Sequence, residues 1–477
     1  MSNKVNGISC VAVLFCVTAL PAFAQTASQI TDDSYAPDVI QSSGYGVRIV
    51  GGSGQATPAG AEKLQITPSK LNVDGGMPEM AEDTAAIEAQ IAGKRVTAAD
   101  LFKAARDLEA AYARAGFILT RVSVPPQTIN DGQPLRLTVT YGFIESVDNS
   151  ALSDRIGRHV ARLLAPLVGQ KGVTRQQIER QLLLAGDTPG LMLRSVLKAG
   201  KTPGGAIIVV EGKHDLVTST VMVDNGYSSE LGTAHVTYGA DLNSPTGHGE
   251  VIYARVGGYP GGAGGSIFDS LPRSRQLVAG FSVPLGTRGY WLNMEAVDSR
   301  TNAKSDQSYS LPDHYQRLSA RLGYHWLRSR NANLATQLSF DVSRELQQLE
   351  MSGSLSDFSE DQLRVLRLVQ QGDIYLSDNS HLSGSVTLSQ GLDVLGAREG
   401  TASVPLSRDG AAPDFTKLGL EARFQQAFGG GILRPSRWLQ RHNIRSVIRW
   451  LLPNRLALAA CRCFRPMTAV PWWGTVA

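Results

Sequence analysis

The sequence predicts two small α+β domains followed by a long all-β region. Residues 96–144 combine a helical period with two strands of alternating polarity, and a similar combination recurs over residues 143–212. From Leu216 onward the helical period is absent and apolar residues alternate with polar ones. A chain of 477 residues is long enough for two or three such domains.

Residues 1–24 have the features of a secretory signal peptide. Lys4 supplies a positive start, Ile8–Leu20 an apolar core, and Ala22–Ala24 a small-x-small cleavage site. A buried helix would also be apolar, but the N-terminal position and the cleavage pattern favour export. Residues 25–62 are rich in Gly, Ser, Thr, Ala and Pro, so they are predicted to be a flexible leader or linker.

Residues 63–142 are predicted to form the first α+β domain. Thr97 is a good N-cap with Asp100 three residues on, and Gly116 has the position of a glycine that ends a helix. Two alternating strands follow, with prolines, Asp131 and Gly132 between them. The predicted elements are a first strand within Leu64–Val73, helices at Glu82–Ala92 and from Thr97 to Gly116, and strands at Ile118–Val124 and Leu135–Tyr141.

The string AYARAGFILTRVSVPPQTINDGQPLRLTVTYGFI resembles the first POTRA domain of two-partner secretion transporters, the TpsB proteins of the haemolysin activation/secretion family. That family has Tyr, Gly-aromatic, Pro-x-Gln, Asp-Gly and Gly-x-Ile in this order. Tyr141 is a departure, since the family usually has an acidic residue there. Relatives often carry a plug helix before this domain, but residues 25–62 show no convincing helix. The motif positions are Tyr112, Gly116, Phe117, Pro126 (or Pro125), Gln127, Asp131, Gly132, Gly142 and Ile144.

Residues 143–212 are predicted to be a second POTRA domain. The order is strand, helix, helix, strand, strand, and Thr174 with Gln177 forms a second capping box. The predicted elements are a strand at Phe143–Val147, helices at Ser150–Leu164 and Thr174–Leu184, and strands at Gly190–Leu197 and Ala206–Glu211. An unrelated α+β domain would share this order.

Residues 213–431 are predicted to form part of an antiparallel transmembrane β-barrel. The clearest strand runs from Leu318 to Trp326, with apolar residues on one face and Arg317, Ser319 and Arg321 on the other. A soluble β-sandwich alternates in the same way, so the signal peptide and the POTRA resemblance decide for the barrel. Short turns such as residues 286–289 are predicted to alternate with long polar loops at residues 257–273 and 344–363. Further alternating segments lie at residues 234–242, 277–285, 334–342, 382–392 and 418–424.

Residues 432–477 form an aberrant tail rich in Arg and Trp. The last 44 residues, from Arg434, hold eight Arg and no acidic residue. A basic amphipathic helix is one interpretation. A shifted reading frame, however, gives a second interpretation. If each codon begins at the third base of the present one, the genetic code allows residues 467–477 to become Y-D-S-x-A-V-V-G-D-R-G, which resembles the family's segment near the end of the barrel. We therefore interpret the tail as the product of a frameshift near Gly431, which makes the barrel incomplete.

Composition and motifs give no indication of catalysis. Without the tail the chain has 38 basic and 42 acidic residues, so no nucleic-acid partner is expected. All four cysteines, Cys10, Cys16, Cys461 and Cys463, lie near the ends, which suits passage through an oxidising compartment. The histidines lack ligand spacing and no phosphate-binding loop is found. We expect no enzyme activity, no cofactor and no metal.

The resemblance implies an outer-membrane transporter with periplasmic POTRA domains. Its partners would be outer-membrane lipid and a large exoprotein of the TpsA type, captured unfolded by addition of a strand to an exposed POTRA edge and secreted through the barrel. The alternatives are an insertion factor for outer-membrane proteins, which usually has more POTRA domains, and a passive porin or uptake channel, which would not need them. The candidate substrate-binding residues are Leu108, Tyr112, Phe117, Leu119 and Arg121, of which Leu108 and Tyr112 fit a core position better.

We predict that the chain as written forms no closed, secretion-competent pore. It has about ten strands between Leu216 and Phe428, whereas the family resemblance implies about sixteen. Four or five unpaired backbone groups on each open edge would cost about 20 kcal/mol in hydrocarbon, above the usual stability of about 5–15 kcal/mol. Expression should give no heat-modifiable barrel, and sequencing should place the missing strands downstream in another frame. A folded, active pore would contradict this.

Overall fold

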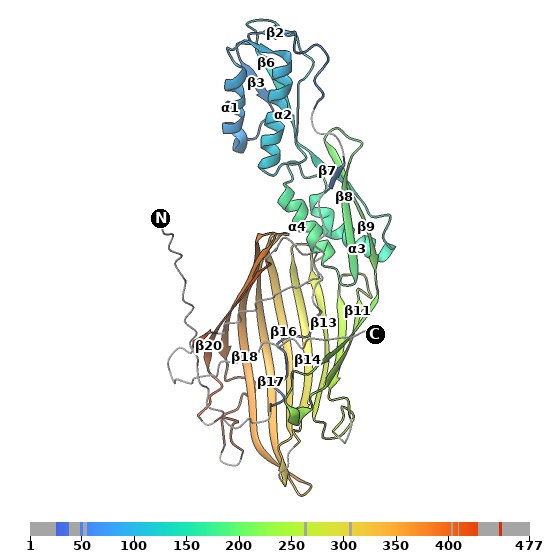
Figure 1. The fold of residues 1–477 in the computed structure, drawn as a ribbon, viewed down its shortest axis with the longest axis vertical. Helices are drawn as coiled ribbons and strands as arrows, with labels where there is room; N and C mark the ends of the chain where they lie inside the picture. The colour runs from blue at the N-terminus through green and yellow to red at the C-terminus, as the bar shows by residue number, and fades with distance from the viewer. Residues whose placement is uncertain are drawn as a thin grey trace, which may run out of the picture.

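The computed structural model describes residues 25–37, 48–50, 55–261, 265–304, 308–401, 404–408, 410–427 and 448–450. Two α+β domains are stacked above one end of a large curved sheet (Figure 1). The predicted signal peptide lies outside the described residues. So does the predicted tail, apart from the three residues of strand β21. None of the described helices is long and apolar enough to cross a membrane.

The first domain packs two helices on a three-stranded sheet of order β3-β6-β5. Strand β3 is parallel to β6, and β5 is antiparallel to it. Leu71, Leu101 and Leu135 are fully buried between the helices and the sheet. The elements are β2 (Gln65–Ile66), β3 (Leu71–Asp74), η1 (Pro78–Met80), α1 (Ala81–Ile91), β4 (Val96–Thr97), α2 (Ala98–Arg114), β5 (Arg121–Ser123) and β6 (Leu135–Thr140).

The predicted ends of helix α2 are confirmed. The Thr97 hydroxyl accepts a hydrogen bond from the Asp100 N–H, and the Asp100 carboxylate accepts one from the Thr97 N–H, which completes the capping box. The Thr97 N–H and the Thr97 hydroxyl both donate to the Asp100 carboxylate, and these two hydrogen bonds lower the pKa of the Asp100 carboxyl. Gly116 ends the helix with a φ of 98°, a left-handed conformation that glycine adopts without strain.

Strand β5 is shorter than predicted because residues 117–120 form turns. The Thr120 N–H donates to the Phe117 carbonyl at 3.0 Å, so the chain bends where an extended strand was expected. The bend carries Leu119 away from the first domain and into the apolar core of the second. The prediction of a strand from Ile118 was therefore wrong over its first three residues.

The second domain repeats the architecture, with helices α3 and α4 packed on a four-stranded sheet of order β1-β8-β9-β7. Thr174 and Gln177 form the predicted capping box of α4. Strand β1 comes from the leader and pairs in parallel with β8. The elements are β1 (Arg48–Val50), β7 (Phe143–Asp148), α3 (Asp154–Leu164), η2 (Ala165–Leu167), α4 (Arg175–Gly186), β8 (Leu191–Ala199) and β9 (Gly205–His214).

Most of the described chain after the second domain forms a 12-stranded sheet in which neighbouring strands are antiparallel. Strand β15 lies off the main path and pairs with β17, also antiparallel. The described edges of this path are β10 and β21. The elements are β10 (Val217–Asp224), η3 (Ser229–Leu231), β11 (His235–Asn243), β12 (Val251–Gly258), β13 (Ser274–Leu285), β14 (Tyr290–Thr301), β15 (Tyr309–Ser310), β16 (Asp313–Arg328), β17 (Ala332–Met351), β18 (Ser354–Ser377), β19 (Ser380–Gly391), β20 (Thr416–Gln426) and β21 (Ile448–Trp450).

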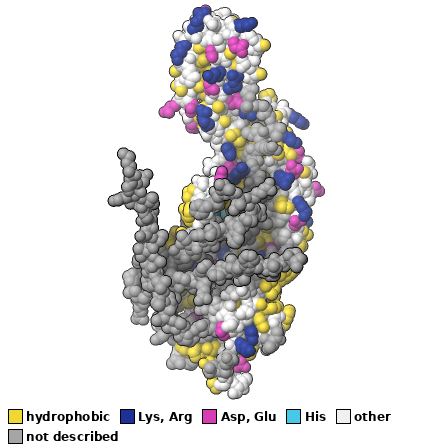
Figure 2. All heavy atoms as spheres, in the orientation of Figure 1, with side chains coloured by type: hydrophobic (Ala, Val, Ile, Leu, Met, Phe, Trp, Pro, Cys, Tyr) yellow, Lys and Arg dark blue, Asp and Glu magenta, His cyan; other side chains and the backbone are white. Residues whose placement is uncertain are grey.

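The two faces of this sheet differ in polarity as the alternation predicted. On β16, Arg317, Ser319 and Arg321 are buried on the concave face, whereas Leu318 and Leu322 are exposed on the convex face. Hydrophobic side chains gather along the flank of the sheet, and charged side chains are scattered over the first α+β domain (Figure 2). An apolar convex face with a polar interior is the arrangement of a barrel wall in lipid.

The predicted polar loop at residues 344–363 is instead a long hairpin. Strands β17 and β18 continue to a two-residue turn at Ser352 and Gly353, both with positive φ. Polar pairs across the strands hold this extension together, and one joins the Arg344 Nε to the Glu360 carboxylate at 2.7 Å. The prediction failed because these strands have polar residues on both faces, which removes the alternation.

We expect Gly142→Ala to destabilise the junction between the two α+β domains. A Cβ at Gly142 would lie 2.1 Å from the Leu119 carbonyl oxygen, so the chain would have to shift, at a cost of about 1–3 kcal/mol. The described α-helices all belong to these two domains, so the 222 nm circular-dichroism signal of the full chain should melt at a lower temperature.

Gly76→Ala is the matched control, because a Cβ there would meet only the Tyr112 hydroxyl at 3.8 Å. Equal melting temperatures for the two variants would contradict the prediction.

Candidate functional site

Strand β5 is one of the two edge strands of the first domain's sheet, and Arg121 was expected to meet a partner there. Arg121 is part of β5, and its guanidinium contacts the Glu109 carboxylate at 3.4 Å. The other Glu109 oxygen accepts the Val122 N–H at 3.0 Å, and the Gln55 side chain accepts the Val124 N–H at 2.8 Å. Side chains from α2 and the leader therefore bond two N–H groups at this edge.

The five candidate binding residues do not share one surface. Leu108 and Tyr112 are fully buried in the core of the first domain, where the Tyr112 hydroxyl accepts the Met77 N–H at 3.0 Å. Leu119 is buried in the core of the second domain. Phe117 is half-buried, edge-on to Tyr112 at 6.2 Å between ring centroids, and the Arg121 side chain is 37% exposed. Only Phe117 and Arg121 are therefore within reach of a partner in this conformation.

The family-motif residues shape the backbone of the first domain. The Gln127 side chain donates to the Arg136 carbonyl and accepts the Arg136 N–H. These two hydrogen bonds to the main chain of β6 continue the pairing beyond the end of β5. The Asp131 carboxylate accepts the Thr67 N–H at 2.7 Å, and Gly132 follows with a φ of 75°. Gly142 leaves room for the Leu119 carbonyl. Pro126 is exposed.

The second α+β domain is held against the sheet by ionic and carbonyl contacts. The Arg328 guanidinium at the end of β16 forms two hydrogen bonds to the Asp187 carboxylate that follows α4. Arg180 on α4 donates to the carbonyl oxygens of His325, at 2.6 Å, and Arg288, at 2.9 Å. Because hydrogen bonds from a guanidinium group are strong and have a specific geometry, these contacts fix the orientation of the second domain over the end of the sheet.

The concave face of the sheet holds a segment of the leader, residues 25–37, which the sequence did not indicate. The segment makes turns but no helix or strand, and Ala27 and Ile30 are buried in it. Its N–H and C=O groups bond side chains of β13, β14, β16 and β17. The prediction that residues 25–62 form a flexible leader was therefore wrong for residues 25–37, which are fixed to the wall.

A buried charge cluster lies at the centre of this contact. The fully buried Glu295 carboxylate lies 3.0 Å from the Arg317 guanidinium and 3.1 Å from that of Arg321. The Tyr253 hydroxyl donates to Glu295 at 3.0 Å, and the Asn293 side chain accepts from Arg321 at 2.7 Å. The two arginines satisfy the buried carboxylate, which would otherwise carry a large desolvation cost.

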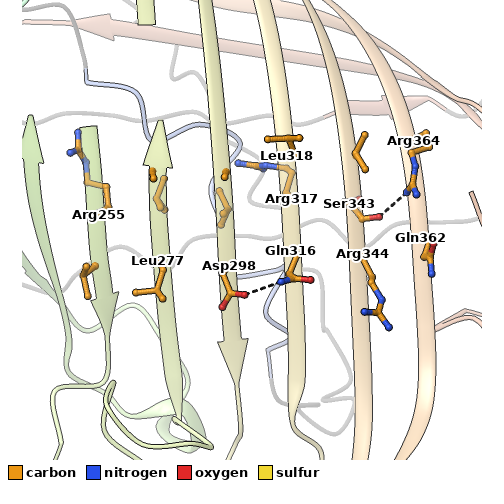
Figure 3. Close-up of a pocket in the computed structure, with 16 residues that line it drawn as sticks. Arg255, Leu277, Asp298, Gln316, Arg317, Leu318, Ser343, Arg344, Gln362 and Arg364 are labelled. Carbon is orange, nitrogen blue, oxygen red and sulfur yellow. Dashed lines mark hydrogen bonds between the residues drawn. The ribbon is translucent and has the colours of Figure 1, made fainter. Parts of the chain in front are cut away.

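An open hollow of about 580 Å³ crosses strands β12 to β18 (Figure 3). Its polar side chains bond their neighbours across the strands. Asp298 accepts from Gln316 at 3.1 Å and contacts His314 at 2.6 Å, while Arg364 donates to the Ser343 carbonyl at 3.2 Å. These groups strengthen the wall, and their arrangement matches no acid–base or nucleophilic pair.

Comparison with known proteins agrees with this architecture. The model of the haemolysin secretion/activation protein family ShlB/FhaC/HecB matches residues 204–445, half of the chain. The ShlB-type POTRA model matches residues 66–142. The chain therefore belongs to the haemolysin secretion/activation family, and its first α+β domain is a POTRA domain. The family match continues past Gly431, so the proposed frame change at that position stays a prediction.

Individual relatives support the same family. The Heme/hemopexin transporter protein HuxB of Haemophilus influenzae strain 86-028NP is 26% identical over 287 residues, 58% of this chain and 48% of the relative. A second HuxB from Haemophilus influenzae is 25% identical over the same shares. The chain thus spans about half the length of the curated relatives it matches. The solved structure of CdiB from Escherichia coli has a TM-score of 0.58 at 17% identity, covers 78% of this chain and 67% of its own, and supports the fold.

We expect acid to weaken the contact between α3 and the sheet through His159. Burial, and secondarily the Arg162 charge, lower the pKa of His159 from 6.5 to about 4, despite the opposing effect of Glu250. Because the unfolded state binds the proton more readily, this stability is present above pH 6.5 and is lost as the pH falls towards 4. Between pH 7 and pH 5 the loss should be about 2 kcal/mol.

The measurement is the thermal melting temperature of the full chain at both pH values. His159→Leu should reduce the difference. Replacing the exposed His248, which has the smallest of the named effects on the pKa of His159, by Asn should change it much less. An unchanged difference in the His159 variant would contradict the assignment.

Proposed function

We propose that the chain is an outer-membrane transporter of the two-partner secretion type, with its POTRA domains in the periplasm. It would bind an unfolded, TpsA-type exoprotein with these domains. Passage along the interior would require the barrel to be closed by the strands that we predict downstream in another frame. The observation that carries the proposal is the continuous arrangement of POTRA domain, second α+β domain and polar concave sheet face, joined by Arg328 and Arg180. Family membership supports transport as the activity.

Capture is proposed at the β5 edge of the POTRA domain. An incoming strand would take the place of the Glu109 and Gln55 side chains, which bond the Val122 and Val124 N–H groups. Arg121 and Phe117 flank this edge and would contact side chains of the strand. Leu108, Tyr112 and Leu119 would act indirectly, by holding α2 and the domain junction in place.

The alternative functions have less support. The structure describes two α+β domains before a single sheet, whereas insertion factors usually carry more such domains. A passive porin or uptake channel would not need a domain docked over the end of its barrel. No observation on the described residues specifically favours either alternative.

We expect Arg121→Glu to weaken exoprotein binding about tenfold or more, because the new carboxylate would repel the incoming strand's carbonyl groups. The test measures binding of the full chain, in detergent micelles, to the unfolded N-terminal segment of the exoprotein encoded beside it.

Arg114→Glu is the matched control, because Arg114 is an exposed arginine in the last turn of α2 and is not part of β5. Unchanged affinity in the Arg121 variant, or an equal loss in the Arg114 variant, would show that capture occurs elsewhere.

A further inference from the structure

The leader segment of residues 25–37 is hydrogen-bonded to the sheet wall through its main chain, and Tyr35 and Ala36 also pack on an apolar cluster of the wall. The Ala27 N–H donates to the Asp313 carboxylate at 2.8 Å, the Ser28 N–H to Glu345 at 3.0 Å, and the Tyr35 N–H to Glu295 at 2.8 Å. Three acidic side chains of the wall therefore accept main-chain N–H groups.

The wall also donates to carbonyl oxygens of the same segment. The Arg317 guanidinium donates to the Asp32 carbonyl at 2.9 Å and that of Arg321 to the Asp33 carbonyl at 2.6 Å. The remaining two hydrogen bonds run from Gln276 to the Ile30 carbonyl, at 2.5 Å, and from Ser299 to the Ala27 carbonyl, at 3.2 Å. These seven hydrogen bonds all end on main-chain atoms.

Several polar side chains of the segment bond within the segment. The Thr31 hydroxyl donates to the Ala27 carbonyl at 2.7 Å, and the Tyr35 hydroxyl accepts the Asp32 N–H at 3.0 Å. The Ser28 and Thr26 hydroxyls lie 3.2 Å apart. The seven contacts therefore recognise a peptide backbone, which every polypeptide has.

Ion pairs and hydrogen bonds among the wall residues themselves keep their side chains in the positions that bind the segment. Glu295 bonds Arg317, Arg321 and Tyr253 on buried strand positions, so its geometry does not depend on the segment. The site presents carboxylates as acceptors and guanidinium, amide and hydroxyl groups as donors, so both the N–H and the C=O groups of a main chain find partners. The hydrogen-bonding part of such a site binds without regard to sequence, and the apolar cluster beside Tyr35 and Ala36 adds affinity for apolar side chains.

We propose that this part of the concave face is a general binding site for polypeptide main chain. Residues 25–37 occupy it at rest, and during transport it binds successive extended segments of the exported exoprotein. The inference rests on the proposed function, because it needs a chain in transit. Sequence-independent binding suits this task, since a long exoprotein presents many different side chains to the same wall.

The test measures binding of fluorescent 13-residue peptides to the full chain in detergent micelles. The receptor carries Ala27→Pro, Ser28→Pro and Tyr35→Pro, which remove the three donating N–H groups and loosen the resident segment. One peptide has the sequence of residues 25–37, one has the same composition in scrambled order, and one is N-methylated at the three corresponding amides. A benzophenone on each peptide maps the contact by cross-linking.

The scrambled peptide should bind within about threefold of the native-sequence peptide, and the N-methylated peptide about tenfold more weakly or worse. Cross-links should fall on β13, β14, β16 and β17. Ser299→Ala should weaken binding about fivefold, because it removes a donor. Ser319→Ala is the matched control, since the buried Ser319 hydroxyl has no hydrogen-bond partner among the described residues.

Three results would overturn the proposal. These are binding of the native-sequence peptide alone, equal binding of the N-methylated peptide, and no binding of any peptide. The experiments distinguish failure of this wall site from failure of the proposed secretion function. Exoprotein that binds the POTRA domain while peptides fail at the wall would refute this site only, whereas peptide binding without exoprotein capture would refute the secretion role.

Discussion

The interior of the sheet depends on one buried carboxylate, that of Glu295, and on the two arginines that neutralise it. A fully buried carboxylate without a partner would cost several kcal/mol, and two buried guanidinium groups would cost more. Placed on adjacent strands at matching heights, the three groups satisfy one another and retain donors for the leader segment. The position of that segment and the alignment of β14 with β16 are therefore set by the same charges.

This charge cluster explains why the concave face can be polar without being disordered. Arg321 bonds Asn293, and Tyr253 bonds both Glu295 and Asn293. Because such a network is rigid only when each member has a partner, its positions tolerate few substitutions. The convex face has no such requirement, since exposed residues such as Leu318 and Leu322 need only be apolar.

Most of the fold could be predicted from the sequence where side chains carry a period or a cap. Thr97, Thr174 and Gly116 marked helix ends correctly, and the alternation from Leu318 to Trp326 gave the two faces of β16. The leader segment could not be predicted, because the hydrogen bonds that attach it to the wall use main-chain atoms, which leave no pattern in the side chains. The burial of Leu119 was missed for a different reason, since it depends on contact with the following domain.

The candidate site could be predicted only in part. Arg121 was placed correctly on β5, but the groups that cover this strand, Glu109 and Gln55, come from segments that no local pattern connects to it. Partners that are distant in sequence are set by tertiary packing alone.

The pairing of leader strand β1 with β8 has a consequence for the protein before it reaches a membrane. An unpaired edge strand is a template for association with other chains, and the outer edge of β8 would be one. Because residues 48–50 of the same chain already occupy that edge, the second domain does not present it to other unfolded proteins in transit. The leader thus replaces the long edge of β8 by a three-residue edge strand, in addition to occupying part of the concave face.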